Sequence, residues 1–240
     1  MKKVGIVGAM DVEVAPILGL LRDARTDVRA RMTFTSGELD GVPVVVAHSG
    51  VGKVNAGICG YVLTGELGCD AVVFSGVAGS VAPEVRVGDV VVSTDCVYDD
   101  VDATNFGYAP GEIPQLGTAR FAADPDLRAA AVAAAREVVG ETAPDARVHE
   151  GTVTSGDSFV RTVDAARHAH ETFGALCHEM EGAAVAQACW LARAPFVVIR
   201  AISDSAYGFD LDDYNEGEAA AAQLAAAITL RLVPSLPVHP

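Results

Sequence analysis

Short apolar runs alternate along the chain with longer alanine-rich stretches. Runs of strand length occur at Val4–Val7, Ala71–Phe74 and Phe196–Ile202, whereas Asp126–Val139 has the length and composition of a helix. Strands that are buried on both faces read as continuous apolar segments, because helices cover the sheet on each side. The alternation therefore predicts the α/β class, with three α/β/α layers and a twisted, mixed but mostly parallel central sheet.

Turn residues divide the rest of the pattern into elements. Asp40-Gly41 separates the extended runs Thr33–Leu39 and Val42–His48, and a two-residue Asp-Gly connection of this kind predicts a hairpin. The other predicted elements are helices over Lys53–Leu67, Glu181–Arg193 and Asp212–Leu232 and strands over Val87–Ser93 and Arg147–Thr154.

The segment Asp99–Gln115 shows no hydrophobic periodicity. It contains glycine, proline and asparagine together with the aromatic residues Phe106 and Tyr108. Long connections without secondary structure are uncommon in compact proteins and are often functional. We therefore expect an ordered loop that serves a site.

The chain has 240 residues, of which 50% are hydrophobic, and a formal net charge of -15. This length and apolar content suffice for a well-packed core, and we expect one domain over residues 1–240. No basic cluster could neutralise a row of phosphates, so DNA and RNA are not expected partners. The first apolar run ends at Asp11 and Glu13, too early for a secretory signal, and no run approaches the roughly 18 apolar residues of a membrane span.

The five cysteines are scattered and odd in number, and no CxxC pair is present. Most lie in apolar segments, which is typical of buried, reduced thiols. Together with the absence of a signal segment, this usage predicts a cytoplasmic protein. The cysteines are Cys59, Cys69, Cys96, Cys177 and Cys189.

Ligands of open α/β sheets collect beyond the carboxyl ends of the strands, where helix N-termini and glycine-rich turns present free N–H groups. This rule selects four segments, and the helix that starts near Glu181 leads into the last of them. The segments are Gly8–Glu13, Ser75–Gly79, Ser155–Val160 and Arg200–Asp204. They bring together three candidate carboxylates: Glu13, Glu181 and Asp204.

Asp204 is the strongest of these candidates. If its strand persists, Arg200, Ile202 and Asp204 share one face, because side chains alternate along a strand. An acid behind so apolar a strand is partly desolvated, which raises its pKa above about 3.9 and keeps it protonated as a donor at neutral pH. The alternative is an aspartate that caps the next turn.

The other candidates have simple structural alternatives. Glu13 stands in the first turn of a helix that Asp11 can cap, where the helix dipole favours an acid without any function. Glu181 begins an apolar helix, and a buried carboxylate there needs donors such as sugar hydroxyls. Phe159 follows a turn, and it either stacks on a flat base or packs in the core.

Three familiar motifs fail on their spacing. Gly5–Gly8 lacks the GxGxxG spacing of a dinucleotide site. Gly50–Val54 is similar to a phosphate-binding P-loop, but Ala47 stands where the first glycine is required. His168 and His170 are two positions apart on a helix, so they face different ways and make poor joint metal ligands. We therefore expect no cofactor and no metal.

Taken together, the segments contain strings in a fixed order: Gly8-Ala9-Met10 with Glu13, Ser49–Val54, Asp102–Thr104 with Phe106–Tyr108, Ser155–Phe159, Glu179–Gly182 and Arg200–Asp204. From Val4 to about Tyr214 the chain resembles the methylthioadenosine/S-adenosylhomocysteine nucleosidases of the nucleoside phosphorylase superfamily. The resemblance implies a nucleoside phosphorylase-like fold. It also implies an N-ribosyl hydrolase that frees adenine from 5'-substituted adenosines.

The resemblance assigns catalytic roles to specific positions. Glu13 activates the attacking water, Asp204 protonates or hydrogen-bonds adenine N7, and Glu181 holds the ribose hydroxyls. Arg200 helps to place the water or Glu13. These roles suit N-glycosidic cleavage, which builds positive charge on the ribose and negative charge on the departing base.

The resemblance also implies how the substrate is held. Phe159 stacks on adenine, the backbone of Val160 reads the purine edge, and Met180 forms a wall under the ribose. Met10, Val51 and Ala103 line an apolar pocket that accepts a 5' thioether. The implied substrate-binding set is Ala9, Met10, Val51, Ala78, Gly79, Phe159, Val160, Glu179, Met180, Glu181 and Ser203.

The family assembles as a homodimer, and the resemblance implies that the long loop of one subunit closes the site of the other through Phe106 and Pro114. Two positions depart from the family pattern. Val77 replaces a serine that some relatives carry near the water and the catalytic acid. The segment Ser205–Leu211 is shorter than in relatives, with Leu211 where a phenylalanine caps the 5' pocket.

These departures leave several functions open. The preferred 5' substituent could belong to methylthioadenosine, S-adenosylhomocysteine, 5'-deoxyadenosine or the 6-amino-6-deoxyfutalosine of menaquinone synthesis. A phosphate-dependent nucleoside phosphorylase on the same fold is the nearest rival. A nucleoside-binding protein without turnover is a third reading, although a binder has no need for an acid and a base together.

Overall fold

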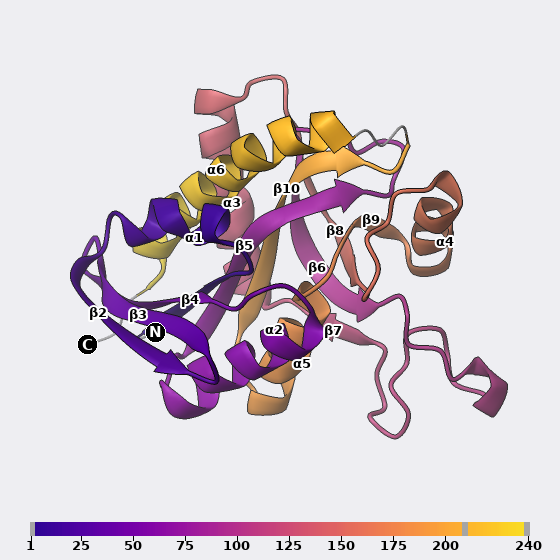
Figure 1. Ribbon diagram of the computed structural model, residues 1–240, viewed down its shortest axis with the longest axis horizontal. Coiled ribbons are helices and arrows are strands. Elements are labelled where there is room, and N and C mark those ends of the chain that lie inside the picture. The colour runs from indigo at the N-terminus through magenta and orange to yellow at the C-terminus, as the bar shows by residue number, and fades with distance from the viewer. Residues whose placement is uncertain (1–2, 208–210, 238–240) are drawn as a thin grey trace.

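The computed structural model describes residues 3–207 and 211–237, except for the side chains of 211–216. Its strands form a ten-stranded mixed sheet with helices on both faces, which confirms the predicted α/β class (Figure 1). The strands are β1 Val4–Gly8, β2 Arg22–Arg29, β3 Met32–Leu39, β4 Val42–His48, β5 Ala71–Ser80, β6 Val90–Tyr98, β7 Arg120–Ala122, β8 Val148–Ser155, β9 Ala175–Glu179 and β10 Phe196–Ser205. The helices are α1 Asp11–Leu18, α2 Lys53–Tyr61, the π-helical η1 Val62–Glu66, the 3-10 turn η2 Thr104–Phe106, α3 Pro125–Thr142, α4 Val163–Phe173, α5 Gly182–Ala192 and α6 Leu211–Ser235.

Part of the sheet closes on itself. The strand order is β10-β6-β8-β9-β5-β1-β4-β3-β2, with β7 beside β6, and β10 also pairs with β5. Strands β5, β10, β6, β8 and β9 therefore form a ring, which the sequence did not predict. Strands β5 and β9 are antiparallel, but they overlap only through their last residues, with Gly79 opposite His178. The carboxyl ends of β5 and β9 therefore lie side by side, although the two strands run in opposite directions.

Two helical layers cover the sheet. Helices α1, α3 and α6 lie on one face, and α2 and α5 lie on the other (Figure 1). Alternation along β1 serves both layers, because Val4 and Ile6 pack toward α1 and α6 whereas Val7 packs toward α2 and α5. Each such fully buried aliphatic side chain stabilises the fold by roughly 1.5–3 kcal/mol. Within the described residues, no helix has the length and hydrophobicity needed to cross a membrane.

The predicted hairpin is confirmed. Strands β3 and β4 pair antiparallel, with Leu39 opposite Val42. Asp40 and Gly41 have φ angles of 46° and 87°, the left-handed values that a type I′ turn requires at both central positions.

Several boundaries differ from the predictions. Strand β6 continues to Tyr98, beyond the predicted end at Ser93. Ser75–Gly79, predicted as a turn after a strand, belongs to β5 and pairs with β10. Strands β2, β7 and β9 were not predicted. Strand β2 is exposed along almost all of its length, so its sequence carries no alternation of apolar and polar residues.

The start of α1 also differs in detail. The helix begins at Asp11, and Met10 rather than Asp11 occupies the N-cap position. At the other end of the chain, α6 agrees closely with the predicted helix. The shortening predicted for Ser205–Leu211 involves residues 208–210 and the side chain of Leu211, which lie outside the described part of the structure.

Candidate active site

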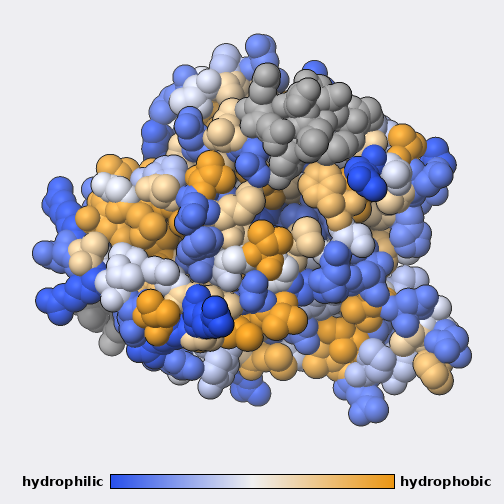
Figure 2. Space-filling model, in the orientation of Figure 1, coloured by the Kyte–Doolittle hydropathy of each residue, from blue (hydrophilic) through white to orange (hydrophobic). Residues whose placement is uncertain are grey.

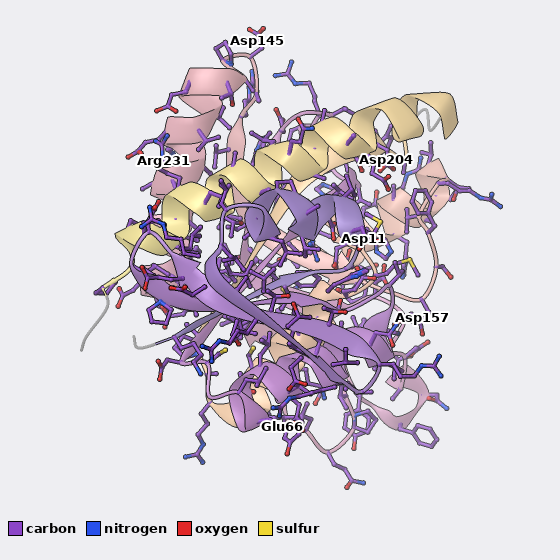
Figure 3. The ribbon with its side chains drawn as sticks, turned by 60° about the vertical axis from the view of Figure 1, so that its left-hand side comes forward. Asp11, Glu66, Asp145, Asp157, Asp204 and Arg231 are labelled. Carbon is purple, nitrogen blue, oxygen red and sulfur yellow. The ribbon has the colours of Figure 1, made fainter. Side chains whose placement is uncertain are left out.

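A cavity of about 240 Å³ lies where the carboxyl ends of β1, β5, β9 and β10 meet the start of α1. In Figure 3, Asp11, Asp157 and Asp204 lie toward this side of the molecule, and Arg231 lies on the opposite side. The four segments that the sequence selected all contribute to the wall. The lining residues are Ala9, Met10, Glu13, Val51, Val77, Ala78, Gly79, Phe159, Val160, His178, Glu179, Met180, Glu181, Ser203 and Asp204.

Four predicted site residues do not line the cavity in this chain, and one of them is Ala103, which is buried just before η2. Arg200 lies behind the wall and is only 1% exposed. Phe106 is 79% exposed at the end of η2, and Pro114 is exposed further along the same loop. This loop projects away from the sheet at the lower right of Figure 1.

Glu13 is buried at the start of α1, and both of its carboxylate oxygens accept hydrogen bonds. Oε2 accepts the N–H groups of Ala9 at 2.7 Å and Met10 at 3.0 Å. Oε1 accepts the N–H of Val77 at 2.9 Å, which ties α1 to β5. Burial raises the pKa of Glu13, against the opposing effects of the Arg200 charge and these N–H donors. A buried carboxylate with a raised pKa is a stronger base once it is ionised.

Arg200 supplies the positive charge behind the cavity. Its guanidinium donates to Glu179 Oε2 at 2.5 Å and lies 3.9 Å from the centre of the Phe74 ring. Gly76 makes room for this arrangement, because a Cβ atom there would lie 2.3 Å from Arg200 Nη1 and 2.4 Å from Glu13 Oε1. Gly76, which was predicted to lie in a turn, therefore lets Glu13 and Arg200 both approach strand β5.

Glu181 stands at the N-cap position of α5 and is also buried. Its Oε1 accepts the N–H of Gly52 at 2.6 Å. Burial and the neighbouring Glu179 charge raise the pKa of Glu181 to about 7. Glu181 can accept a hydrogen bond from a hydroxyl group when it is ionised and can donate one when it is protonated.

Asp204, near the end of β10, also lines the cavity and is buried. Ser203 Oγ donates to Asp204 Oδ1 at 2.7 Å, whereas no described residue hydrogen-bonds to the buried Oδ2. Burial raises the pKa of Asp204, and the Ser203 hydrogen bond and the His178 charge only partly oppose it. A buried carboxyl oxygen without a donor favours the protonated acid, as predicted for this residue.

The position of Asp204 on its strand differs from the prediction. The pairing of β10 with β5 shifts register between Ile202 and Asp204, so that Asp204 lies opposite Gly79. This irregularity interrupts the alternation that would have placed Arg200 and Asp204 on one face. A Cβ atom at Gly79 would lie 2.9 Å from Asp204 Oδ2, so this glycine leaves room for the carboxyl group.

Comparisons with known proteins agree with this geometry. The Phosphorylase superfamily profile matches residues 3–234. A 5'-methylthioadenosine/S-adenosylhomocysteine nucleosidase from Chromohalobacter salexigens is 44% identical over 207 residues, which cover 86% of this chain and 86% of that protein. The crystal structure of the nucleosidase of the same name from Neisseria meningitidis, in complex with methylthio-immucillin-A, has a TM-score of 0.92 and 38% identity, and the match covers 98% of this chain and 100% of that one.

The chain belongs to the methylthioadenosine/S-adenosylhomocysteine nucleosidase family. A futalosine hydrolase mutant from Helicobacter pylori is also similar, with a TM-score of 0.88, 31% identity and coverage of 98% of this chain and 100% of that one. The resemblance predicted from the sequence strings is therefore confirmed at the level of the family.

Glu179, predicted from the nucleosidase resemblance as a binding residue, makes contacts that position its neighbours. Its carboxylate accepts the Ser155 hydroxyl, the N–H groups of Glu181 and Gly182, and Arg200 Nη2. These donors come from β8, β10 and the start of α5. Glu179 therefore fixes the backbone on which Glu181 stands.

Two lining residues lay outside the predicted binding set. Val77 was noted only as a departure from the nucleosidase pattern, yet its N–H holds Glu13. His178 was not noted, because a single histidine within the short β9 has no spacing signal. Its position directly before Glu179 is the only feature of the sequence that places it near the site.

Proposed function

We propose that this protein hydrolyses the N-glycosidic bond of 5'-substituted adenosines, such as 5'-methylthioadenosine and S-adenosylhomocysteine, and releases adenine. One observation carries the proposal. A single cavity holds a carboxylate surrounded by donors, Glu13, and a carboxyl group with a bare buried oxygen, Asp204. Cleavage with water needs a base and an acid at separate points of one substrate.

Glu13 is the proposed general base. Three N–H groups hold its carboxylate in one orientation, and the Arg200 charge favours its ionised form. It removes a proton from the water that attacks the anomeric carbon. Asp204 is the proposed general acid and delivers a proton to adenine N7, so that the base leaves as a neutral molecule.

Glu181 is proposed to hold the ribose. One of its oxygens accepts from Gly52, and the other is proposed to bind substrate hydroxyls. Phe159 and Val160 are proposed to bind the purine, and Met180 to form a wall under the sugar. Each of these residues lines the cavity, which supports the proposal. The apolar surface of Met10 and Val51 suits a 5' thioether.

Water rather than phosphate is the proposed nucleophile. A phosphorylase binds its dianion with backbone N–H groups, arginines and hydroxyls. Here the N–H groups of Ala9, Met10 and Val77 already donate to Glu13. The Glu13 carboxylate thus takes the place of the anion, and two like charges about 4 Å apart in a partly buried site would cost on the order of a few kcal/mol.

The decisive experiment follows adenine release at fixed methylthioadenosine while phosphate is raised from none to tens of millimolar. We expect a rate that is independent of phosphate and a free 5'-substituted ribose by mass spectrometry. A phosphorylated sugar, or a rate that vanishes without phosphate, identifies a phosphorylase instead. Binding without product identifies a nucleoside-binding protein. The substrate panel includes S-adenosylhomocysteine, 5'-deoxyadenosine and 6-amino-6-deoxyfutalosine, since one similar structure is a futalosine hydrolase.

We further propose a homodimer in which the loop of one subunit covers the cavity of the other. Four exposed apolar side chains line a groove between α2 and α5: Val54, Ile58, Tyr61 and Leu191. Hydrophobic surface gathers over α2 in the lower half of Figure 2. Val51, which lines the cavity and is 50% exposed, lies just before this helix. A partner docked on α2 could therefore bring its Phe106 and Pro114 to the 5' end of the cavity.

The proposed location is the cytoplasm. All five cysteines are free, buried thiols, which suits a reducing compartment. Sedimentation velocity of the purified protein tests the dimer, and cell fractionation tests the location.

A further inference from the structure

His178 lines the cavity from β9, and none of the proposed roles uses it. Its side chain is only 4% exposed. Nδ1 lies 2.9 Å from Asp99 Oδ2, and Nε2 lies 3.0 Å from the carbonyl oxygen of Ser158. The Thr154 hydroxyl is 3.4 Å from Nδ1, but this hydroxyl donates its hydrogen to the Cys177 carbonyl. Both ring nitrogens therefore face acceptors.

Only the imidazolium form of a histidine donates from both nitrogens. The ionisable groups that face His178 from the elements packed against it are acidic: Asp99 after β6, Glu179 in β9 and Asp204 in β10. Burial by itself lowers the pKa of His178. The hydrogen bond and charge of Asp99, with smaller contributions from the Ser158 carbonyl and Glu179, outweigh burial and raise this pKa above its ordinary value.

The second contact of His178 is with the loop that holds the purine wall. The Ser158 carbonyl directly precedes Phe159, which lines the cavity together with Val160. Gly156, at the start of this loop, lies against the same pair. A Cβ atom there would lie 2.4 Å from Asp99 Oδ1 and 3.2 Å from His178 Cε1. The loop is therefore shaped around the histidine and its aspartate.

An outer tie holds the same loop from the solvent side. The N–H of Asp157 donates to Asp100 Oδ2 at 2.8 Å, and Lys53 Nζ contacts both Asp100 and Asp157. These contacts are more exposed than the hydrogen bond between His178 and the Ser158 carbonyl, which we call the inner tie. Solvent and salt therefore screen the outer tie. The inner tie, through His178, is the one that a change of protonation can release.

We propose that His178, as an imidazolium paired with Asp99, is a positioning residue that fixes the loop Gly156–Val160 and thereby sets the affinity for the purine. When His178 loses its proton, Nε2 or Nδ1 is left facing an acceptor without a hydrogen. The loop then loses its inner tie and Phe159 is no longer held against the base. This inference rests on the proposed nucleosidase function, because it concerns the affinity of the same cavity.

The test measures KM and kcat for methylthioadenosine from about pH 6 to about pH 9. For the wild type we expect KM to rise, with kcat changing less, as the pH passes a value above the ordinary histidine pKa of 6.5. His178→Gln keeps an N–H donor but no charge. Its KM should be raised about tenfold at neutral pH and should no longer follow the histidine titration.

Asp99→Asn supplies the sharper variant. It keeps an acceptor for Nδ1 but removes the charge that raises the pKa of His178, so KM should begin to rise at a lower pH than in the wild type. His149→Gln is the matched control, because His149 contacts Asp89 at 2.9 Å and does not line the cavity. Its KM profile should coincide with that of the wild type.

A wild-type KM that stays constant over this range, or an Asp99→Asn profile that coincides with the wild type, overturns the proposal. A readout free of turnover is the NMR titration of the histidine Cε1–H resonances. The chain has six histidines, and loss of one signal in His178→Gln assigns it. If His178→Gln does not fold, the KM profile of Asp99→Asn still decides. Failure of the wild type to release adenine at any pH refutes the proposed function instead, whether or not the histidine titrates as expected.

Discussion

Strand β6 has an aspartate–histidine pair at each end. Asp89, before the strand, accepts the N–H groups of Arg86 at 3.1 Å and Arg147 at 2.8 Å, and it lies 2.9 Å from His149 Nε2. Burial opposes ionisation of Asp89, but the His149 and backbone hydrogen bonds outweigh it and hold its pKa below the ordinary value. The pair joins the adjacent starts of the parallel strands β6 and β8.

The second pair, Asp99 with His178, follows the same strand but has a different neighbourhood. Its histidine bonds to the loop at the cavity wall, whereas the Asp89 carboxylate is surrounded by backbone donors away from the cavity. Similar residue pairs thus contribute chiefly to stability at one end and chiefly to the site at the other. The contrast teaches that the role of an aspartate–histidine pair depends on which further groups the two residues contact.

The largest expected effect lies at the carboxyl ends of the strands. Glu13→Gln should lower kcat about a thousandfold, because an amide cannot remove a proton from water. The cavity keeps its shape, so a substrate analogue should still bind. Steady-state adenine release and calorimetry with the analogue measure the two quantities. Near-normal turnover would exclude Glu13 as the base. It would also argue against catalysis at the carboxyl ends of the strands.

Asp204→Asn should lower kcat about a hundredfold. The amide can still donate a hydrogen bond to the purine, but it cannot deliver a proton. The smaller expected loss reflects the hydrogen bond that remains. The measurement is kcat at neutral pH, with analogue binding as the control. Unchanged turnover means that another residue protonates the leaving base.

Asp89→Asn tests the other end of β6. At neutral pH we expect unfolding to become easier by about 2 kcal/mol with kcat unchanged, because one of its oxygens no longer accepts an N–H donor. The folded pKa of Asp89 is depressed, so its contribution is present above the unfolded pKa and is lost as pH falls through the folded value. The difference from the wild type in urea unfolding should therefore shrink at acid pH. A large loss of kcat in the folded variant would show that the Asp89–His149 pair also serves the active site, contrary to the comparison above.

The smallest effect concerns the proposed extension of the site across a dimer. Phe106→Ala removes an aromatic side chain that is 79% exposed in the single chain. If it covers the partner's 5' pocket, KM for methylthioadenosine should rise about fivefold, or about 1 kcal/mol, and KM for adenosine should change less. Equal changes for both substrates would argue against this placement. Sedimentation of the variant separates loss of the loop contact from loss of the dimer.

Most of the residues predicted for the site line one cavity, because they stand in short segments at strand ends. Glu13 follows β1, and Asp204 lies near the end of β10, so the topology brings both to one edge. Two details of this region escaped prediction for a physical reason. The register shift before Asp204 and the extended conformation of Ser75–Gly79 depend on the pairing of β5 with β10, which are far apart in the sequence.

The remaining differences have the same kind of cause. The exposed strand β2 has no apolar face for a pattern to reveal, and its pairing with β3 is what makes it a strand. His178 and Asp99 are also distant in sequence, and the pairing of β8 with both β6 and β9 brings them within 2.9 Å. Local sequence patterns identify the residues that follow a strand, but they do not show which strand ends come together in the fold.

The closed ring of strands also bears on how the molecule fluctuates. In an open sheet, a strand at the edge can detach by breaking the pairing on one side only. Strand β2 is such an edge, whereas β5 and β10 pair with each other and with further strands. Fraying can therefore begin at β2 and stop before it reaches Glu13 or Asp204. The distance between the acid and the base should persist until the ring opens as a unit, so that partial opening and loss of activity are separate events.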